Sequence, residues 1–169
     1  MQKVAGFAFD QRDGEHYSVH GTIPAEYMEN FEKRKTYIGP GEEVGGVAAF
    51  YSLPPKLFKG RRIIHFVDNA GSLSHLVNGY AGQPDSARIV NMFHVALIAF
   101  GSEYWGEWVP SKENIADIMT RPERFAELKA GLQGAHLVEC ELKLPPLGED
   151  WTKLRAWMRT MRARAAESE

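Results

Sequence analysis

The stretch Gly60-Arg-Arg-Ile-Ile-His-Phe-Val-Asp-Asn-Ala70 decides the fold, because it joins a strand, a carboxylate and the start of a helix in one short run. Ile63 to Val67 are apolar and mostly β-branched, which predicts a buried strand. Asp68 follows this strand directly, and Ala70 to Asn78 have the pattern of a short helix. A buried strand that leads through a carboxylate into a helix is typical of α/β proteins.

Upstream of this stretch, the sequence predicts a hairpin and then a helix. Val4 to Phe9 form an apolar run that ends at Asp10, and a second strand is expected from Tyr17 to Ile23. Tyr37 and Ile38 predict a short third strand. Glu42 to Leu53 then turn to helical spacing.

Downstream, helices and strands alternate. Ser86 is the expected N-cap of a helix whose apolar positions run from Ile89 to Phe100. Tyr104 to Val109 predict a third buried strand, and helical segments follow over 113–120 and 123–132. An initial hairpin followed by this alternation predicts a mixed five-stranded sheet flanked by helices.

The chain has 169 residues, of which 44% are hydrophobic and 25% charged, as expected for one soluble domain with a tail. We assign residues 1–133 to an α/β domain and residues 134–169 to a C-terminal extension. The extension predicts a strand from Leu137 to Leu144 and an amphipathic basic helix from Trp151 to Ala166.

Composition excludes several classes of protein. The single cysteine, Cys140, cannot form an intramolecular disulfide, and no signal-peptide pattern opens the chain, so we expect an intracellular location. No apolar run approaches the ~20 residues of a membrane span. The net charge of −2 argues against a protein that coats nucleic acid through bulk positive charge.

Acidic residues stand at the ends of the predicted elements. Asp10 and Asp68 follow strands, and Asp117 lies in a helical segment after a third strand. Because the ends of strands in α/β sheets meet at one edge, we expect these carboxylates to converge. Glu42 or Glu43, at the start of a helix, would complete the group.

Carboxylates gathered in this way repel one another unless a divalent cation neutralises them, and oxygen ligands favour Mg²⁺ or Mn²⁺ over zinc. Each acid also has an ordinary alternative. Asp10 can open a turn, Asp68 with Asn69 can cap a helix, and Asp117 can be solvated.

Two motifs resemble one family. The run Gly60 to Ala70 is similar to the strand and Asp-Asn step of ribonuclease H domains in retroelement reverse transcriptases, of the tyrosine-recombinase type and related elements. The run Trp108-Val-Pro-Ser-Lys-Glu-Asn-Ile-Ala-Asp-Ile-Met-Thr-Arg-Pro122 resembles the final motif of these domains. The resemblance covers about residues 4–125. It implies a ribonuclease H-like fold, to which residues 134–169 add a helical tail.

The resemblance also implies a site and an activity. The four carboxylates of the family correspond to Asp10, Glu42, Asp68 and Asp117, with Glu43 in place of Glu42 if the helix register differs by one. They would hold two Mg²⁺ or Mn²⁺ ions and cleave the RNA strand of an RNA·DNA hybrid. The implied partners are this hybrid and flanking reverse transcriptase domains. The substrate-binding residues that the resemblance implies are Asn69, Ser111, Lys112, Asn114 and Arg121.

The chain departs from cellular relatives in one loop. Those relatives carry a histidine before the last carboxylate, whereas this chain has Ser111, Lys112 and Asn114 there. This departure implies that product release or proton transfer is handled differently.

Two alternatives to a hybrid-cleaving nuclease stay open. One is a non-catalytic module of the same fold that binds nucleic acid or protein, and the other is a nuclease of this superfold that acts on DNA.

Overall fold

A computed structural model describes residues 2–132 and 136–147, together with the isolated positions 156, 158–160, 162–164 and 166. The chain begins with a hairpin. Strands β1 (Lys3–Phe9) and β2 (His16–Thr22) pair antiparallel, with Phe9 opposite His16. Gly14, in the turn between them, has a φ of 71°, which favours glycine. Strand β5 (Leu137–Cys140) adds to β2 in parallel, so the order is β1-β2-β5.

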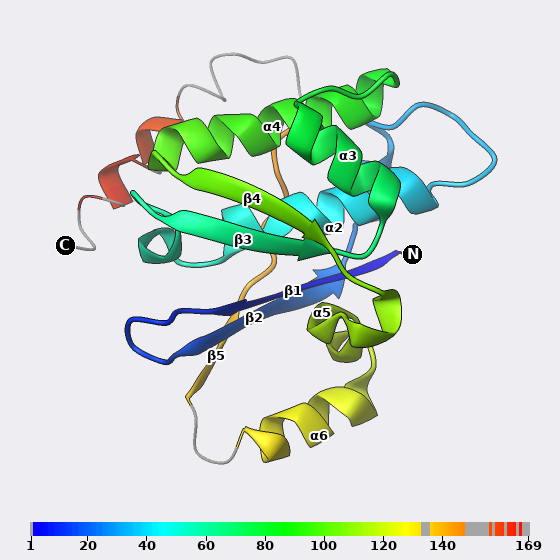
Figure 1. The fold of residues 1–169 in the computed structure, drawn as a ribbon. Helices are drawn as coiled ribbons and strands as arrows, with labels where there is room; N and C mark the ends of the chain where they lie inside the picture. The colour runs from blue at the N-terminus through cyan, green and yellow to red at the C-terminus, as the bar shows by residue number, and fades with distance from the viewer. Residues whose placement is uncertain are drawn as a thin grey trace.

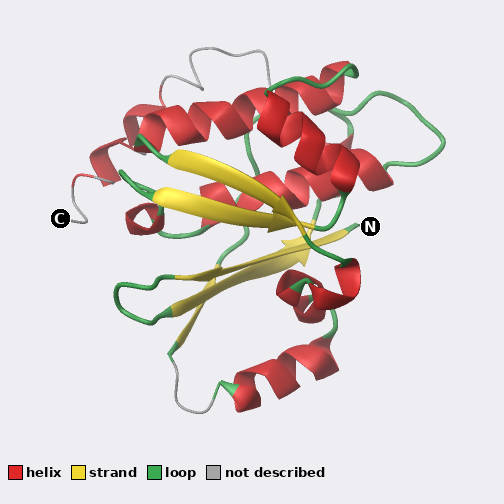
Figure 2. Ribbon diagram, viewed as in Figure 1, coloured by secondary structure: helices red, strands yellow, loops and turns green. Residues whose placement is uncertain are grey.

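A second sheet contains two parallel strands. Strands β3 (Arg62–Val67) and β4 (Glu103–Trp108) pair along their whole length, from Arg62 opposite Glu103 to Val67 opposite Trp108. Figures 1 and 2 show that the β3–β4 pair lies beside the β1–β2 hairpin and forms a separate group of strands. The α/β class with a mixed sheet is therefore confirmed. The single five-stranded sheet is not formed, because the five strands of the described residues lie in two sheets.

The strand expected at Tyr37 and Ile38 is wrong, because helix α2 begins there. Pro40 lies in the first turn of α2, where its missing N–H costs no hydrogen bond. The cap expected at Ser86 is also wrong. Helix α4 begins at Pro84 after Gln83, and Ser86 is buried in the first turn.

The helices have the following bounds: α1 (Ala25–Met28), α2 (Ile38–Ser52), η1 (Pro55–Leu57), α3 (Ala70–Asn78), α4 (Pro84–Phe100), η2 (Ser111–Glu113), α5 (Ile115–Met119) and α6 (Pro122–Gly131).

The main core lies under helices α2, α3 and α4, which pack on one side of the strands (Figure 1). Phe50 of α2 meets Phe93 of α4 edge to face, with ring centroids 5.0 Å apart. Such aromatic pairs add about 0.5–1.5 kcal/mol beyond the burial of their area. The opposite face of the hairpin is covered by α5 and α6, and Phe125 of α6 packs against the ring of His20 on β2.

Helix α2 contacts both sheets through residues with little or no side chain. A Cβ on Gly45 would lie 3.2 Å from Val4 of β1, and a Cβ on Gly46 would lie 3.5 Å from His65 of β3. A Cβ on Gly6 would come within 3.0 Å of the Ala49 methyl group. The small residues therefore let one helix approach the backbones of both sheets closely.

The segment from β5 to Leu147 belongs to the same core. Leu147 is buried, and the Tyr27 hydroxyl donates a 2.7 Å hydrogen bond to the carbonyl of Pro145. The extension assigned to residues 134–169 thus shares the core of the domain up to residue 147. Of the helix expected from Trp151 to Ala166, Trp151, Trp157 and Met161 lie outside the described residues, and the positions that are described are helical. In the described part of the chain, no helix has the length and apolar character needed to cross a membrane.

Candidate active site in a cleft between the two sheets

A cleft of about 540 Å³ separates strand β1 from strand β3. Its floor is the first half of α2, and its mouth is closed on one side by η2 and α5. Three of the predicted acidic residues line it, namely Glu42, Asp68 and Asp117, and we call this group the acidic cleft. The three carboxylates come from α2, the end of β3 and α5, so the fold brings together residues that are far apart in the sequence.

Glu42 lies on the first half of α2 and is half-buried. Burial raises the pKa of its carboxyl group above the ordinary value, and the nearby charge of Asp68 raises it further. Asn69 opposes this shift, because its side-chain amide donates a 2.5 Å hydrogen bond to Oε2 of Glu42. Glu42 and Asp68 are thus close enough to repel each other.

Asp68 follows the last residue of β3 and stays half-buried at the end of the strand. Its backbone carbonyl accepts a 3.3 Å hydrogen bond from Nε1 of Trp108. Within residues 2–132 and 136–147, no donor pairs with its carboxylate. A carboxylate in this position, beside a second acid, is available to a cation.

Asp117 reaches the cleft from α5, which begins at an asparagine cap. Oδ1 of Asn114 accepts a 3.0 Å hydrogen bond from the backbone N–H of Ala116, and Asn114 also lines the cleft. One oxygen of Asp117 pairs with the exposed Arg121 at 3.2 Å, four residues further along. Such an exposed pair contributes little to stability, so a cation can compete with it.

Glu43 points away from this cleft. It is buried and pairs with Nδ1 of His75 on α3. Its second oxygen, Oε2, is buried without a hydrogen-bond partner among the described residues. At the start of α2 it is therefore Glu42 that lines the acidic cleft. The sequence has no local signal for the pairing of Glu43 with His75, because the two residues lie on different helices.

Asp10 does not join the other acids, which corrects the expected convergence. It follows β1, and it accepts a 2.9 Å hydrogen bond from Nη2 of Arg61, the residue just before β3. The end of β1 thus lies at the beginning of β3, so the two strands run in opposite directions. Asp68 stands at the far end of β3, and the two aspartates occupy opposite ends of the sheets.

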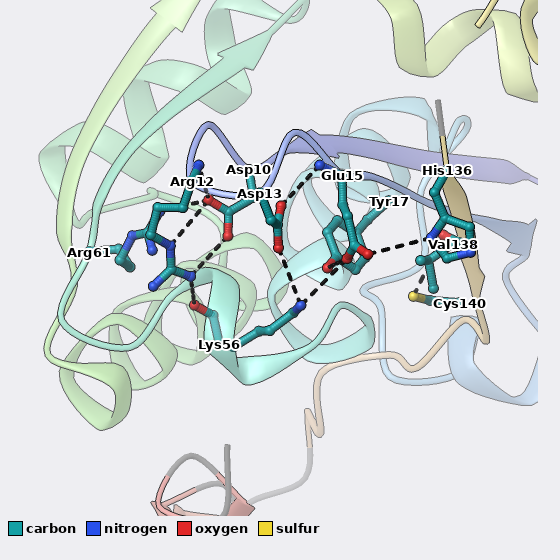
Figure 3. A network of polar contacts seen from close by, with 10 residues as sticks. All are labelled: Asp10, Arg12, Asp13, Glu15, Tyr17, Lys56, Arg61, His136, Val138 and Cys140. Carbon is teal, nitrogen blue, oxygen red and sulfur yellow. Dashed lines mark hydrogen bonds and ion pairs between the residues drawn. The ribbon is translucent and has the colours of Figure 1, made fainter. Parts of the chain in front are cut away.

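Asp10 is held in a network of ion pairs (Figure 3). It is only 2% exposed, and Arg12 binds it from the other side with Nη2 at 2.9 Å. Burial alone would raise the pKa of Asp10, but the hydrogen bonds and charge of Arg12 outweigh burial and lower it. Beside this pair, Lys56 lies 3.5 Å from carboxylate oxygens of Asp13 and Glu15. The network ties the hairpin to the start of β3.

The substrate-binding residues that the sequence predicts lie around the same end of β3. Oδ1 of Asn69 caps α3 by accepting a 2.8 Å hydrogen bond from the N–H of Ser72. Ser111 and Lys112 are exposed on η2, next to Asn114, and Arg121 is exposed beside Asp117. Asn69 thus has a structural role as a cap in addition to its contact with Glu42.

The donor chemistry of the acidic cleft suits a hard cation, because Glu42, Asp68 and Asp117 all supply carboxylate oxygens. Glu113 of η2 also lines the cleft, and the only lysine among the described residues of its lining is Lys3 of β1. The ligand set is not closed, however. Among the residues that the structure describes, no three His, Cys, Asp or Glu side chains lie together closely enough to hold a metal ion. His65, which also lines the cleft, stays neutral, because burial lowers its pKa to about 4.

The chain matches no protein-family model, and no curated protein or solved structure matches it.

Proposed function

We propose that this protein is a metal-dependent nuclease domain of the ribonuclease H type, which cleaves the RNA strand of RNA·DNA hybrids. The observation that carries the proposal is the acidic cleft, in which Glu42, Asp68 and Asp117 line one space from three separate elements. Asp68 and Asp117 are also the acids of the two motifs that resemble ribonuclease H domains of retroelement reverse transcriptases.

Glu42, Asp68 and Asp117 are the residues that would hold Mg²⁺ or Mn²⁺. A divalent ion bound there supplies an activated water and neutralises the charge on a phosphodiester. Without the ion, burial raises the pKa of Glu42, and the charge of Asp68 adds a smaller repulsion in the same direction. Asn69 orients Glu42, and Asn114 holds the first turn of α5, which carries Asp117. Ser111 and Lys112, which are exposed on η2 beside the cleft residue Asn114, would contact the sugar-phosphate backbone.

A cleavage assay tests the proposal. The full chain is incubated with end-labelled RNA·DNA hybrid, duplex RNA and duplex DNA, in Mg²⁺, in Mn²⁺ and in chelator. We expect divalent-dependent cleavage of the RNA strand of the hybrid. Removing an oxygen ligand in Asp68→Asn or Glu42→Gln should lower the rate by roughly 100-fold or more, because even groups that only support a metal ligand contribute 10–100-fold.

Glu123→Gln is the matched control for Glu42→Gln, since Glu123 is exposed on α6 away from the cleft. This variant should cleave like the unmodified chain. Cleavage that persists in chelator, or in Asp68→Asn, would refute metal-dependent catalysis in this cleft. Preferential cleavage of duplex DNA would replace the hybrid with the DNA substrate.

A second candidate is a non-catalytic binding module of the same fold. It is favoured by the position of Asp10, whose ion pairs with Arg12 and Arg61 keep this predicted ligand out of the cleft. Tight binding of hybrid without cleavage in any divalent ion would favour this candidate over the nuclease.

A further inference from the structure

The cleft between β1 and β3 is bounded by the edges of the strands and not by their faces. Five consecutive residues of β1, Lys3 to Phe7, line it, and so do the consecutive residues from Ile64 to Asp68. Side chains of a strand alternate between two faces, so consecutive residues share a boundary only along the backbone edge. The cleft therefore faces two rows of backbone N–H and C=O groups.

Neither edge is paired across the cleft. In the described ranges, β1 pairs with β2 alone, and β3 pairs with β4 alone. Open edges of this kind are templates for another strand. The length of the gap also suits a strand, because the six residues of β3 extend over ~20 Å.

The floor of the cleft leaves room for side chains. The residues of α2 beneath it include Gly41, Gly45, Gly46 and Ala49, none of which carries more than a methyl group. The same helix packs against Val4 of β1 and His65 of β3, so it spans the opening without filling it. Inward side chains of an inserted strand would pack on this floor.

The rim of the cleft is apolar and exposed. On β3, Ile64 and Phe66 are 65% and 57% exposed, on the face turned away from α2. Exposed apolar side chains that adjoin one another beside an open strand edge mark a candidate contact surface. A strand beside β3 would flank both with its own side chains on that face, so the fitting occupant carries β-branched side chains on both faces.

We propose that this cleft is filled by one extended polypeptide strand that joins Gln2 through a tight turn, antiparallel to β1 and parallel to β3. The direction follows from the position of Gln2, which lines the cleft at the end where Asp68 lies. A strand that finishes there continues into β1 as a hairpin. The inserted strand makes one continuous sheet of the two, and its last residue lies beside Glu42, Asp68 and Asp117.

The test extends the full chain before Gln2 by a strand of seven alternating valine and threonine residues and an Asn-Gly turn. The matched control has the same length, with two of the valines replaced by proline, which cannot pair in a sheet. Hydrogen exchange is measured at the amides of β1 and β3 that face the cleft, together with thermal melting. We expect at least tenfold slower exchange at these amides and a higher melting temperature with the alternating strand only.

Equal exchange at these amides in the two extended chains would overturn the proposal. The free valine-threonine peptide, added at millimolar concentration to the unextended chain, tests the source. If the free peptide slows exchange at these amides as strongly as the joined strand does, the proposed connection of the strand to Gln2 is wrong. Protection by the joined strand alone supports it, because the tether raises the effective concentration of the strand.

In two further extended chains, the last residue of the added strand is Asp in one and Asn in the other. This comparison rests on the proposed function. Without metal, the Asp chain should melt at a lower temperature than the Asn chain, because it places one more carboxylate beside Glu42, Asp68 and Asp117. Mg²⁺ should stabilise the Asp chain more, and the Asp chain should cleave hybrid faster. If exchange at the edge amides is slowed but Mg²⁺ does not raise the melting temperature, the metal site is rejected and the inserted strand is retained. If exchange at these amides is not slowed, the inserted strand itself is rejected.

Discussion

The two ends of strand β3 hold acidic residues in opposite circumstances. At its beginning, the carboxylate of Asp10 is buried between Arg12 and Arg61, and its pKa is lowered. At its end, Asp68 has no cationic partner in the described part of the chain and lies beside Glu42, whose pKa is raised. Both aspartates directly follow an apolar strand in the sequence. The difference teaches that the cations around a carboxylate decide whether it stabilises the fold or remains available to a ligand.

The largest expected effect is at the Asp10 end. Asp10→Asn removes the negative charge between two guanidinium groups, one of which, Arg61, is largely buried. Breaking a buried ion pair from one side is strongly destabilising, and we expect the free energy of unfolding to fall by about 3 kcal/mol. Urea denaturation measures it.

Asp13→Asn is the control for this change, because Asp13 belongs to the same network but its pair with Lys56 is exposed. It should change stability by less than about 0.5 kcal/mol. A similar small effect in Asp10→Asn would mean that Asp10 is not needed to join the hairpin to β3.

A second effect is expected when the pH is lowered, at His65 of β3, which lines the cleft. His65 has a pKa of about 4 in the folded chain, because burial disfavours its charged form, against about 6.5 when unfolded. A lowered histidine pKa means that stability is complete above pH ~6.5 and falls as the pH drops toward 4. We expect a loss of about 2 kcal/mol over this window.

His65→Phe should flatten that dependence, which chemical denaturation at pH 7 and at pH 4.5 would measure. Hydrogen exchange should show that α2 and β3 loosen at acid pH while the Asp10 end stays closed, since the pKa of Asp10 lies below this range. If the Asp10 end opened first, the comparison between the two ends would be reversed.

The smallest effect is expected in the acidic cleft itself. Asp68→Asn removes the repulsion on Glu42 and should stabilise the metal-free chain by about 0.5 kcal/mol at pH 7. The raised pKa of Glu42 means that its penalty is present above that pKa and disappears as the pH falls, so the gain should shrink toward pH 4. Thermal melts with and without Mg²⁺ should show the ion stabilising the unmodified chain more than the variant. A marked loss of stability in Asp68→Asn would make Asp68 a structural residue.

Local patterns in the sequence were sufficient for the elements around β3. The run from Ile63 to Val67, the following Asp68 and the helix from Ala70 to Asn78 all occur where the sequence predicts them. The helix cap that the sequence offers as an alternative role for Asp68 with Asn69 is formed by Asn69, whose side chain accepts from the N–H three residues away. These features depend on neighbours in the chain.

The position of Asp10 could not be predicted in the same way. Periodicity identifies β1 as a strand, but it contains no information on whether β1 runs with or against β3, and that direction alone decides which end Asp10 occupies. The pairing of Asp10 with Arg61 joins residues 51 positions apart, and no local pattern predicts it. The expected strand at Tyr37 failed for a different reason, since two residues cannot distinguish a strand from the first turn of a helix.

The way in which α2 lies under both sheets has a consequence for how the molecule unfolds. No backbone ladder joins β1 to β3 in the described residues, so the hairpin with β5 and the pair β3–β4 are linked by side-chain packing on α2 and by the Asp10 network. Units without a shared ladder can open separately, with different free energies. We therefore expect the hairpin and the β3–β4 pair to separate when α2 is lost, since α2 packs against both.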